Sequence, residues 1–228
     1  MCRVDGCFRP PTKFSHLCEY HRNVDRVHGH PLQKAVTKSE VRPYEKAVRQ
    51  YLDRKSGPRV QAVIERDWNR VVRDAEEFIE AGNRGRVQNT HQRRAMKIVV
   101  DIAKDVPAID IGVLLMAMGF LYADQPRRWA SDEGFQFQAA RMLRRLARGE
   151  TSYTWQPDGR MVRSSAKRCP QAVMRALWVL IYETNFIGYG VQIRGEIEKG
   201  RALKQKDRIA DLREILGPTS TIAKGQSA

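Results

Sequence analysis

The sequence predicts a mainly α-helical fold, in which a small cysteine-rich N-terminal module precedes a multi-helix domain with one β-hairpin. Three observations lead to this prediction. Apolar residues recur at helical spacing from residue 39 to residue 216, four potential metal ligands fall within the first 21 residues, and Pro157-Asp158-Gly159 interrupts the helical pattern. The expected division is residues 1–36 for the module, 37–216 for the helical domain and 217–228 for a flexible tail.

The four potential ligands are Cys2, Cys7, Cys18 and His21, which follow the spacing C-x4-C-x10-C-x2-H. Three thiolates and one imidazole complete a tetrahedral zinc shell, and such a closed shell is typical of a structural site. The segment has few apolar residues, so metal binding rather than burial is expected to supply its folding free energy. Gly6 suits a tight turn before Cys7, and the last spacing suits the first turn of a helix. The alternative is a disulfide, which the lack of a signal peptide disfavours because cytosolic thiols stay reduced.

The same segment carries a longer motif, C-x3-G-C-x-R-P…L-C-x2-H-x-R…H-G-x-P. Its members are Cys2, Gly6, Cys7, Arg9, Pro10, Leu17, Cys18, His21, Arg22, His28, Gly29 and Pro31. The motif resembles the small zinc knuckle of many bacteriophage proteins, which often precedes an HNH endonuclease domain and is thought to help hold DNA. The resemblance implies zinc binding, contact with nucleic acid and an origin in a phage or mobile element. It does not extend to the nuclease, because an HNH site needs two further histidines and an asparagine, and only His91 follows His30.

Helices are predicted through most of the remaining chain, with ends marked by capping residues and by glycine or proline breaks. The predicted helices cover residues 39–55, 58–82, 90–105, 107–122, 132–148, 170–184 and 191–216. Ser39, Thr90 and Ser131 are the expected N-caps. Gly57-Pro58 separates the first two helices, and Gly188-Tyr189-Gly190 separates the last two.

The β-hairpin is predicted from two short segments on either side of a turn. Residues 152–156 and 160–164 contain Tyr, Thr, Trp, Met and Val, which favour strands. Between them, proline fixes φ and Gly159 accepts a left-handed conformation. An irregular loop around the same turn is the alternative.

A row of arginines marks the helix before this hairpin. Arg141, Arg144, Arg145 and Arg148 lie at i, i+3, i+4 and i+7, with no acidic residue among them. Their mutual repulsion is a cost that a bound anion relieves, so the row predicts contact with phosphate. The alternative is an ordinary solvated helix face.

The order of elements around the hairpin is that of a winged helix. Three helices are followed by a β-wing, on which Arg160 and Arg163 are expected to contact nucleic acid. The long connection over residues 123–130 and the apolar helix after the hairpin depart from that pattern. The alternative is a hairpin inserted in a helical bundle.

The charge of the chain favours a nucleic-acid partner, with DNA preferred over RNA. Lys and Arg number 41 against 26 Asp and Glu, a net charge of +15. Residues 37–188 alone contain 27 basic and 18 acidic residues, so the excess does not come from a basic tail. In the module, Arg9, Arg22 and Arg26 are the expected contacts. An acidic protein surface is the alternative partner.

The sequence therefore predicts a zinc-containing nucleic-acid-binding protein, such as a DNA-binding regulator or replication accessory factor of a phage or mobile element. The alternatives are a phage protein that inhibits a host enzyme or defence complex, and a degenerate HNH-like nuclease. The chain lacks a G-x4-G-K-[ST] loop and an H-E-x-x-H motif, so no catalytic residue is predicted. Without an apolar stretch of about 18 to 20 residues, no membrane partner is expected, and the expected location is the cytoplasm of a bacterial host.

Overall fold

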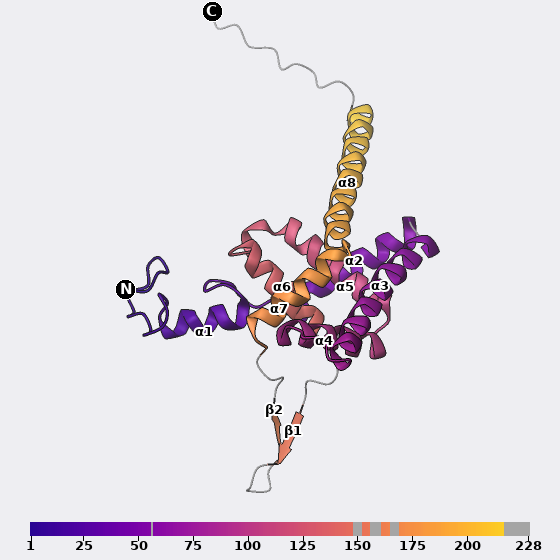
Figure 1. Ribbon diagram of the computed structural model, residues 1–228. Helices are drawn as coiled ribbons and strands as arrows, with labels where there is room; N and C mark the ends of the chain where they lie inside the picture. The colour runs from indigo at the N-terminus through magenta and orange to yellow at the C-terminus, as the bar shows by residue number, and fades with distance from the viewer. Residues whose placement is uncertain (56, 148–151, 156–160, 165–168, 217–228) are drawn as a thin grey trace, which may run out of the picture.

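The computed structural model describes residues 1–55, 57–147, 152–155, 161–164 and 169–216, and its fold is mainly α-helical, as predicted (Figure 1). The elements are α1 (Glu19–His28), α2 (Lys38–Lys55), α3 (Gly57–Asn83), α4 (Thr90–Asp105), α5 (Ala108–Asp124), the short 3-10 helix η1 (Pro126–Arg128), α6 (Asp132–Arg144), β1 (Ser152–Trp155), β2 (Met161–Ser164), α7 (Gln171–Glu183) and α8 (Phe186–Leu216).

Helix α5 is the centre of the helical body. Every residue from Ile111 to Leu121 is buried, whichever face of the helix it occupies. A helix that is apolar all round must be enclosed by other elements. α5 packs most extensively against α8 and α2, and also contacts α3 and α6. The metal-ligand module lies outside this core, at the end of the molecule marked by α1 (Figure 1).

The close approach of α5 and α8 depends on glycine. A Cβ added to Gly190 would overlap the carbonyl oxygen of Met116, and one added to Gly119 would overlap that of Ile187. The prediction that Gly188-Tyr189-Gly190 breaks the chain before residue 191 is therefore wrong. These residues lie inside α8, where a missing side chain lets two helix backbones come together.

Three other helix ends differ from the prediction. Thr37 caps α2 in place of Ser39, because its hydroxyl accepts a hydrogen bond from the amide of Glu40 at 3.2 Å. Asn89 caps α4 in place of Thr90, because its side chain accepts hydrogen bonds from the backbone amides of His91 and Gln92. α6 ends at Arg144 rather than at residue 148, and Arg145 already lies beyond it. The predicted cap at Ser131 is confirmed, with its hydroxyl accepting from the amide of Gly134 at 3.0 Å.

The predicted fold class needs one correction, which concerns the β structure. β1 and β2 pair antiparallel, with Ser152 opposite Ser164 and Trp155 opposite Met161, and each strand has four residues. Among the described residues each strand packs chiefly on the other, and Figure 1 shows the pair standing away from the helices. A winged helix needs a wing packed beside its third helix. The winged-helix part of the prediction is therefore wrong, and among the described residues the packed body is made of helices.

The module is joined to the body by residues 30–37, here called the joint. Gln33 and Val36 of the joint are buried. The amide of Val36 donates to Oε1 of Gln138 at 2.9 Å, and Nε2 of Gln138 donates to the carbonyl of His28 at 3.0 Å. One buried side chain of α6 thus holds both the end of α1 and the end of the joint.

Within the described part of the chain, no single helix is long and apolar enough to cross a membrane. The consecutive pair α4 and α5 reaches that length and hydropathy only together, across a bend of 120°.

Candidate metal centre and its arginine-lined groove

The backbone of the module brings its cysteines together through one tight turn and one helix start. Gly6 has a φ of 74°, the left-handed conformation predicted for this position, and the amide of Cys7 donates to the carbonyl of Val4 at 3.1 Å. Cys18 is the N-cap of α1, so His21 follows within the first turn of the helix. Residues three apart on a helix share a face, and His21 is therefore directed toward the cysteine loop.

The four predicted ligands form one cluster. One ligand atom from each of Cys2, Cys7, Cys18 and His21 lies within 4.8 Å of all the others. Nδ1 of His21 is 3.4 Å from the sulfurs of both Cys2 and Cys18, and the sulfurs of Cys7 and Cys18 are 3.9 Å apart. These four side chains are close enough to hold a metal ion, with Nδ1 as the ligand atom of the imidazole.

The surroundings of Cys2 favour a thiolate. Burial raises the pKa of this thiol, but hydrogen bonds from the amides of Cys18 and Val4 and contacts with the His21 and Cys18 side chains outweigh it and bring the pKa to about 6. The amide of Cys18 donates to Sγ of Cys2 at 3.3 Å. Since a metal binds the thiolate rather than the thiol, this environment prepares Cys2 as a ligand.

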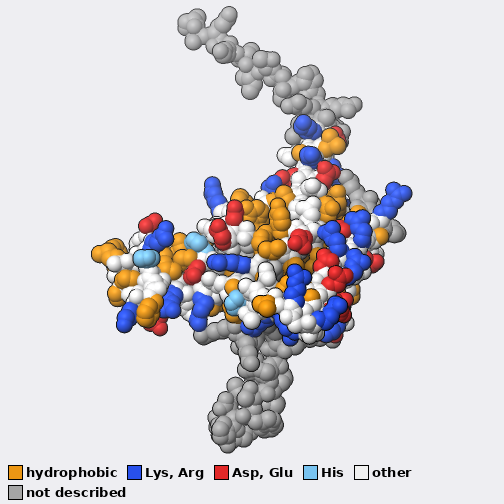
Figure 2. Space-filling model, in the orientation of Figure 1, with side chains coloured by type: hydrophobic (Ala, Val, Ile, Leu, Met, Phe, Trp, Pro, Cys, Tyr) orange, Lys and Arg blue, Asp and Glu red, His pale blue; other side chains and the backbone are white. Residues whose placement is uncertain are grey.

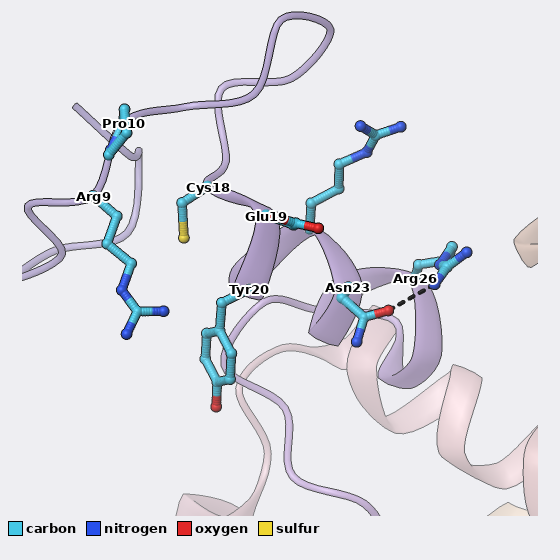
Figure 3. A pocket seen from close by; sticks show the side chains of 8 residues that line it. Arg9, Pro10, Cys18, Glu19, Tyr20, Asn23 and Arg26 are labelled. Carbon is cyan, nitrogen blue, oxygen red and sulfur yellow. Dashed lines mark hydrogen bonds between the residues drawn. The ribbon is translucent and has the colours of Figure 1, made fainter.

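A groove of about 770 Å³ lies beside the cluster, between the cysteine loop and α1. It is lined by Arg9, Pro10, Cys18, Glu19, Tyr20, Arg22, Asn23 and Arg26. Figure 3 shows Arg9 of the loop and Tyr20 of α1 extending side by side, and the guanidinium of Arg9 lies 5.6 Å from the centre of the Tyr20 ring. The sulfur of Cys18 is part of the same wall, so the groove depends directly on the metal-ligand cluster.

The groove is electrostatically unbalanced. Its side chains include three arginines and one carboxylate, that of Glu19. Among the residues that the structure describes, none of these arginines forms an ion pair, although Arg26 donates to the Asn23 side chain at 2.6 Å. All three arginines were predicted from the sequence to contact nucleic acid, and the structure places them around one hollow.

The arginine row on α6 is arranged differently from the prediction. Nη1 of Arg141 lies 3.1 Å from Nδ1 of His28, and Nη1 of Arg145 donates to the carbonyl of Val36 at 3.3 Å. Burial and the charges of Arg145 and Arg144 lower the pKa of Arg141. Burial, Arg141 and Arg145 likewise lower the pKa of His28 and so favour its neutral form. Two members of the row therefore bond to the module and the joint.

The remaining predicted contacts lie largely outside what the structure describes. Arg148 and Arg160 fall outside the described residues, and so does the side chain of Arg163 in β2. Their role in binding phosphate stays a prediction.

The aromatic residues of the module were missed. Phe8, Phe14 and Tyr20 are 83%, 82% and 58% exposed. The signal was present as basic and aromatic residues side by side, in Phe8-Arg9, Lys13-Phe14 and Tyr20 two positions before Arg22. Exposed rings interleaved with cations are typical of surfaces that bind nucleobases.

Comparisons with protein-family models, with curated proteins and with solved structures find no match to this chain. The case for function therefore depends on the chemistry of the module and its groove.

Proposed function

We propose that this chain is a zinc-containing nucleic-acid-binding protein whose N-terminal module contacts the phosphate backbone through the arginine-lined groove. Zinc is the metal that fits the ligands best. In a tetrahedral shell with Zn–S near 2.3 Å and Zn–N near 2.0 to 2.1 Å, sulfurs lie about 3.8 Å apart and a sulfur and a nitrogen about 3.6 Å apart. The separations of 3.9 Å and 3.4 Å in the cluster agree with these values. Four protein ligands leave no open position, so the metal has a structural role.

The observation that carries the proposal is the groove itself. Arg9, Arg22 and Arg26 line one hollow between a loop and a helix, and among the described residues none of them forms an ion pair with a carboxylate. A cluster of like charges is relieved by an anion, and guanidinium groups are well suited to phosphate. The net charge of +15 adds long-range attraction of the same sign. The more specific role of a DNA-binding regulator or replication accessory factor is supported only by the sequence resemblance to the phage zinc knuckle.

The test is the salt dependence of binding by the zinc-loaded full chain and a charge-reversed variant. Arg22→Glu with Arg26→Glu should weaken binding to labelled DNA by about tenfold or more, since bonds to charged groups contribute about 1.5 to 3 kcal/mol. It should also flatten the salt slope, because each lost phosphate contact removes about 0.9 from that slope on duplex DNA.

A matched control reverses two exposed arginines of the body, Arg42→Glu with Arg73→Glu, and so changes the net charge equally. If the groove binds phosphate, the control keeps most of the affinity. Equal losses in both variants would mean that only total charge matters. If the unaltered chain shows no salt-dependent binding to DNA or RNA, the proposal is contradicted. The basic surface would then be interpreted as a binding site for a protein.

A further inference from the structure

We propose that the module binds unpaired bases of a single strand, an inference that rests on the proposed function and narrows its substrate class. A second hollow of about 760 Å³ adjoins the arginine-lined groove. The two hollows share Arg9, Pro10 and Tyr20 as lining residues. They therefore adjoin each other on the module, and the pair is called the channel below, with Arg9 and Tyr20 between its two halves.

The second hollow brings the aromatic rings into the channel. Phe8 lines it together with Tyr20, and these rings are 83% and 58% exposed. Leu32, 59% exposed, adds an apolar side chain to the same wall. Figure 2 shows hydrophobic and basic side chains side by side on the module, at the end of the molecule where α1 lies. Exposed aromatic rings are unfavourable in water, and the module has little core in which to bury them. The rings are therefore available for contact with a ligand.

The division of chemistry along the channel fits a single strand. One end presents Phe8 and Leu32, the middle pairs the Arg9 guanidinium with the Tyr20 ring at 5.6 Å, and the other end presents Arg22 and Arg26. Bases of a single strand stack on aromatic rings while the phosphates follow a basic groove. In a duplex the base faces are stacked on each other, so they are not available to Phe8 and Tyr20.

Tyr20 also couples the channel to the metal. Its ring lies edge-on to the His21 imidazole, with centroids 5.1 Å apart, and His21 is one of the four ligands. Phe8 follows Cys7 directly in the chain. Both rings therefore belong to residues that are directly adjacent to metal ligands in the chain. The arrangement of the channel depends on the geometry of the ligand cluster.

The experiment compares Phe8→Ala, Tyr20→Ala and the matched control Phe14→Ala in the zinc-loaded full chain. Phe14 is 82% exposed and has Lys13 5.6 Å from its ring centre, but it lines neither hollow. The probes are a labelled single-stranded DNA, an RNA of the same sequence and the DNA duplex. Zinc content of each variant is measured first, so that a loss of binding is not a loss of metal.

Phe8→Ala and Tyr20→Ala should each weaken single-strand binding by about 5- to 150-fold, the range for one stacked base, and change duplex binding little. Phe14→Ala should leave both unchanged. A preference between the DNA and RNA single strands identifies which one the channel takes. This inference is overturned if all variants bind the single strands with equal affinity, or if the chain binds the duplex more tightly than the single strands. Either outcome leaves the proposed function intact. Binding to none of the three probes overturns both.

Discussion

The N-terminal module and the helical body are held together in opposite ways. In the body, a cluster of buried apolar side chains surrounds α5, with Trp68, Leu115 and Phe186 among its fully buried members. In the module, α1 has no buried residue, and the buried side chains before the joint are Cys2 and Cys18. Of the ten large hydrophobic side chains that are exposed in the described chain, five lie within the first 32 residues.

Under the proposed function, this difference separates the region that provides stability from the region that binds a ligand. A core that buries its apolar residues cannot present them to a ligand. On the proposed zinc assignment, the module can leave Phe8, Phe14 and Tyr20 on its surface, because a structural metal would supply the folding free energy that burial otherwise provides. The region with the least core is thus the region with the most exposed aromatic side chains among the described residues.

The largest expected effect comes from removing one metal ligand. Cys18→Ser should release the metal and unfold the module up to about residue 31, while the helical body stays folded. All four tryptophans lie in the body, at positions 68, 129, 155 and 178, whereas the module contains Tyr20 as its one tyrosine. Tryptophan fluorescence should therefore show an unchanged unfolding transition for the body, and elemental analysis should show the loss of about one zinc per chain.

Cys169→Ser is the matched control, because Cys169 lies outside the cluster and packs against the core. It should keep the metal. A metal content near zero in the unaltered chain, or Cys2, Cys7 and Cys18 recovered as disulfides, contradicts the zinc assignment. Loss of the tryptophan transition in Cys18→Ser would show that the two regions are one cooperative unit.

The next largest effect is expected from Gly190→Ala, which should destabilise the helical body rather than the module. The added Cβ would overlap the carbonyl oxygen of Met116, so α8 must move away from α5. Overpacking of this kind costs about 1 to 3 kcal/mol, and more when backbone must shift, so the midpoint of the tryptophan transition should fall by about 2 to 12 °C. Metal content should not change.

Gly195→Ala provides the control on the same helix. A Cβ at Gly195 meets nothing within 4 Å. Alanine is the better helix former by about 0.5 to 1 kcal/mol, so this variant should be as stable as the unaltered chain or slightly more stable. Equal destabilisation by both substitutions would mean that the α5–α8 contact does not depend on the close backbone approach.

The sequence was sufficient for elements that local chemistry determines. The helix positions, the Ser131 cap, the left-handed Gly6 and the four-ligand cluster all follow from spacing and residue type. It was insufficient where a residue acts across the fold. Gly190 indicates a chain break when only its sequence neighbours are considered, but it lies at a close contact between helix backbones when α5 is considered.

The candidate site shows the same limit. Arg9, Arg22 and Arg26, which line the groove, could be named from the sequence because charge is visible there, whereas the exposure of Phe8 and Tyr20 is not. The arginines on α6 look alike in the sequence, yet Arg141 and Arg145 bond to His28 and to the carbonyl of Val36. No periodicity on α6 indicates those partners, since they lie more than a hundred residues earlier in the chain.

The smallest expected effect concerns the joint between the two regions, where Arg128 is the main anchor. Its guanidinium donates to the Glu40 carboxylate at 2.7 Å, to the carbonyl of Ala35 at 2.9 Å and to that of Lys34 at 3.3 Å. Arg128→Ala leaves these acceptors without their charged donor, so the body should lose about 1 to 2 kcal/mol of unfolding free energy. Arg49→Ala, whose pair with Asp110 is about half exposed, should cost less than about 1 kcal/mol.

The pH dependence of Arg128→Ala distinguishes a lost ion pair from lost packing. Burial raises the pKa of Glu40, but the hydrogen bond and charge of Arg128 and the amide of Thr37 outweigh it, so the pKa is lowered. A carboxyl group whose pKa is lower in the folded chain than in the unfolded chain, where it is about 4.3, stabilises the fold at pH values above about 4.3. This stabilisation is lost as the pH falls through the pKa of the folded chain. In denaturant titrations, the stability gap between the unaltered chain and Arg128→Ala should therefore be full at neutral pH and shrink below about pH 4. A gap that is the same at pH 7 and below pH 4 would mean that Arg128 acts through its packing on Trp129, 5.3 Å from the ring centre, and not through Glu40.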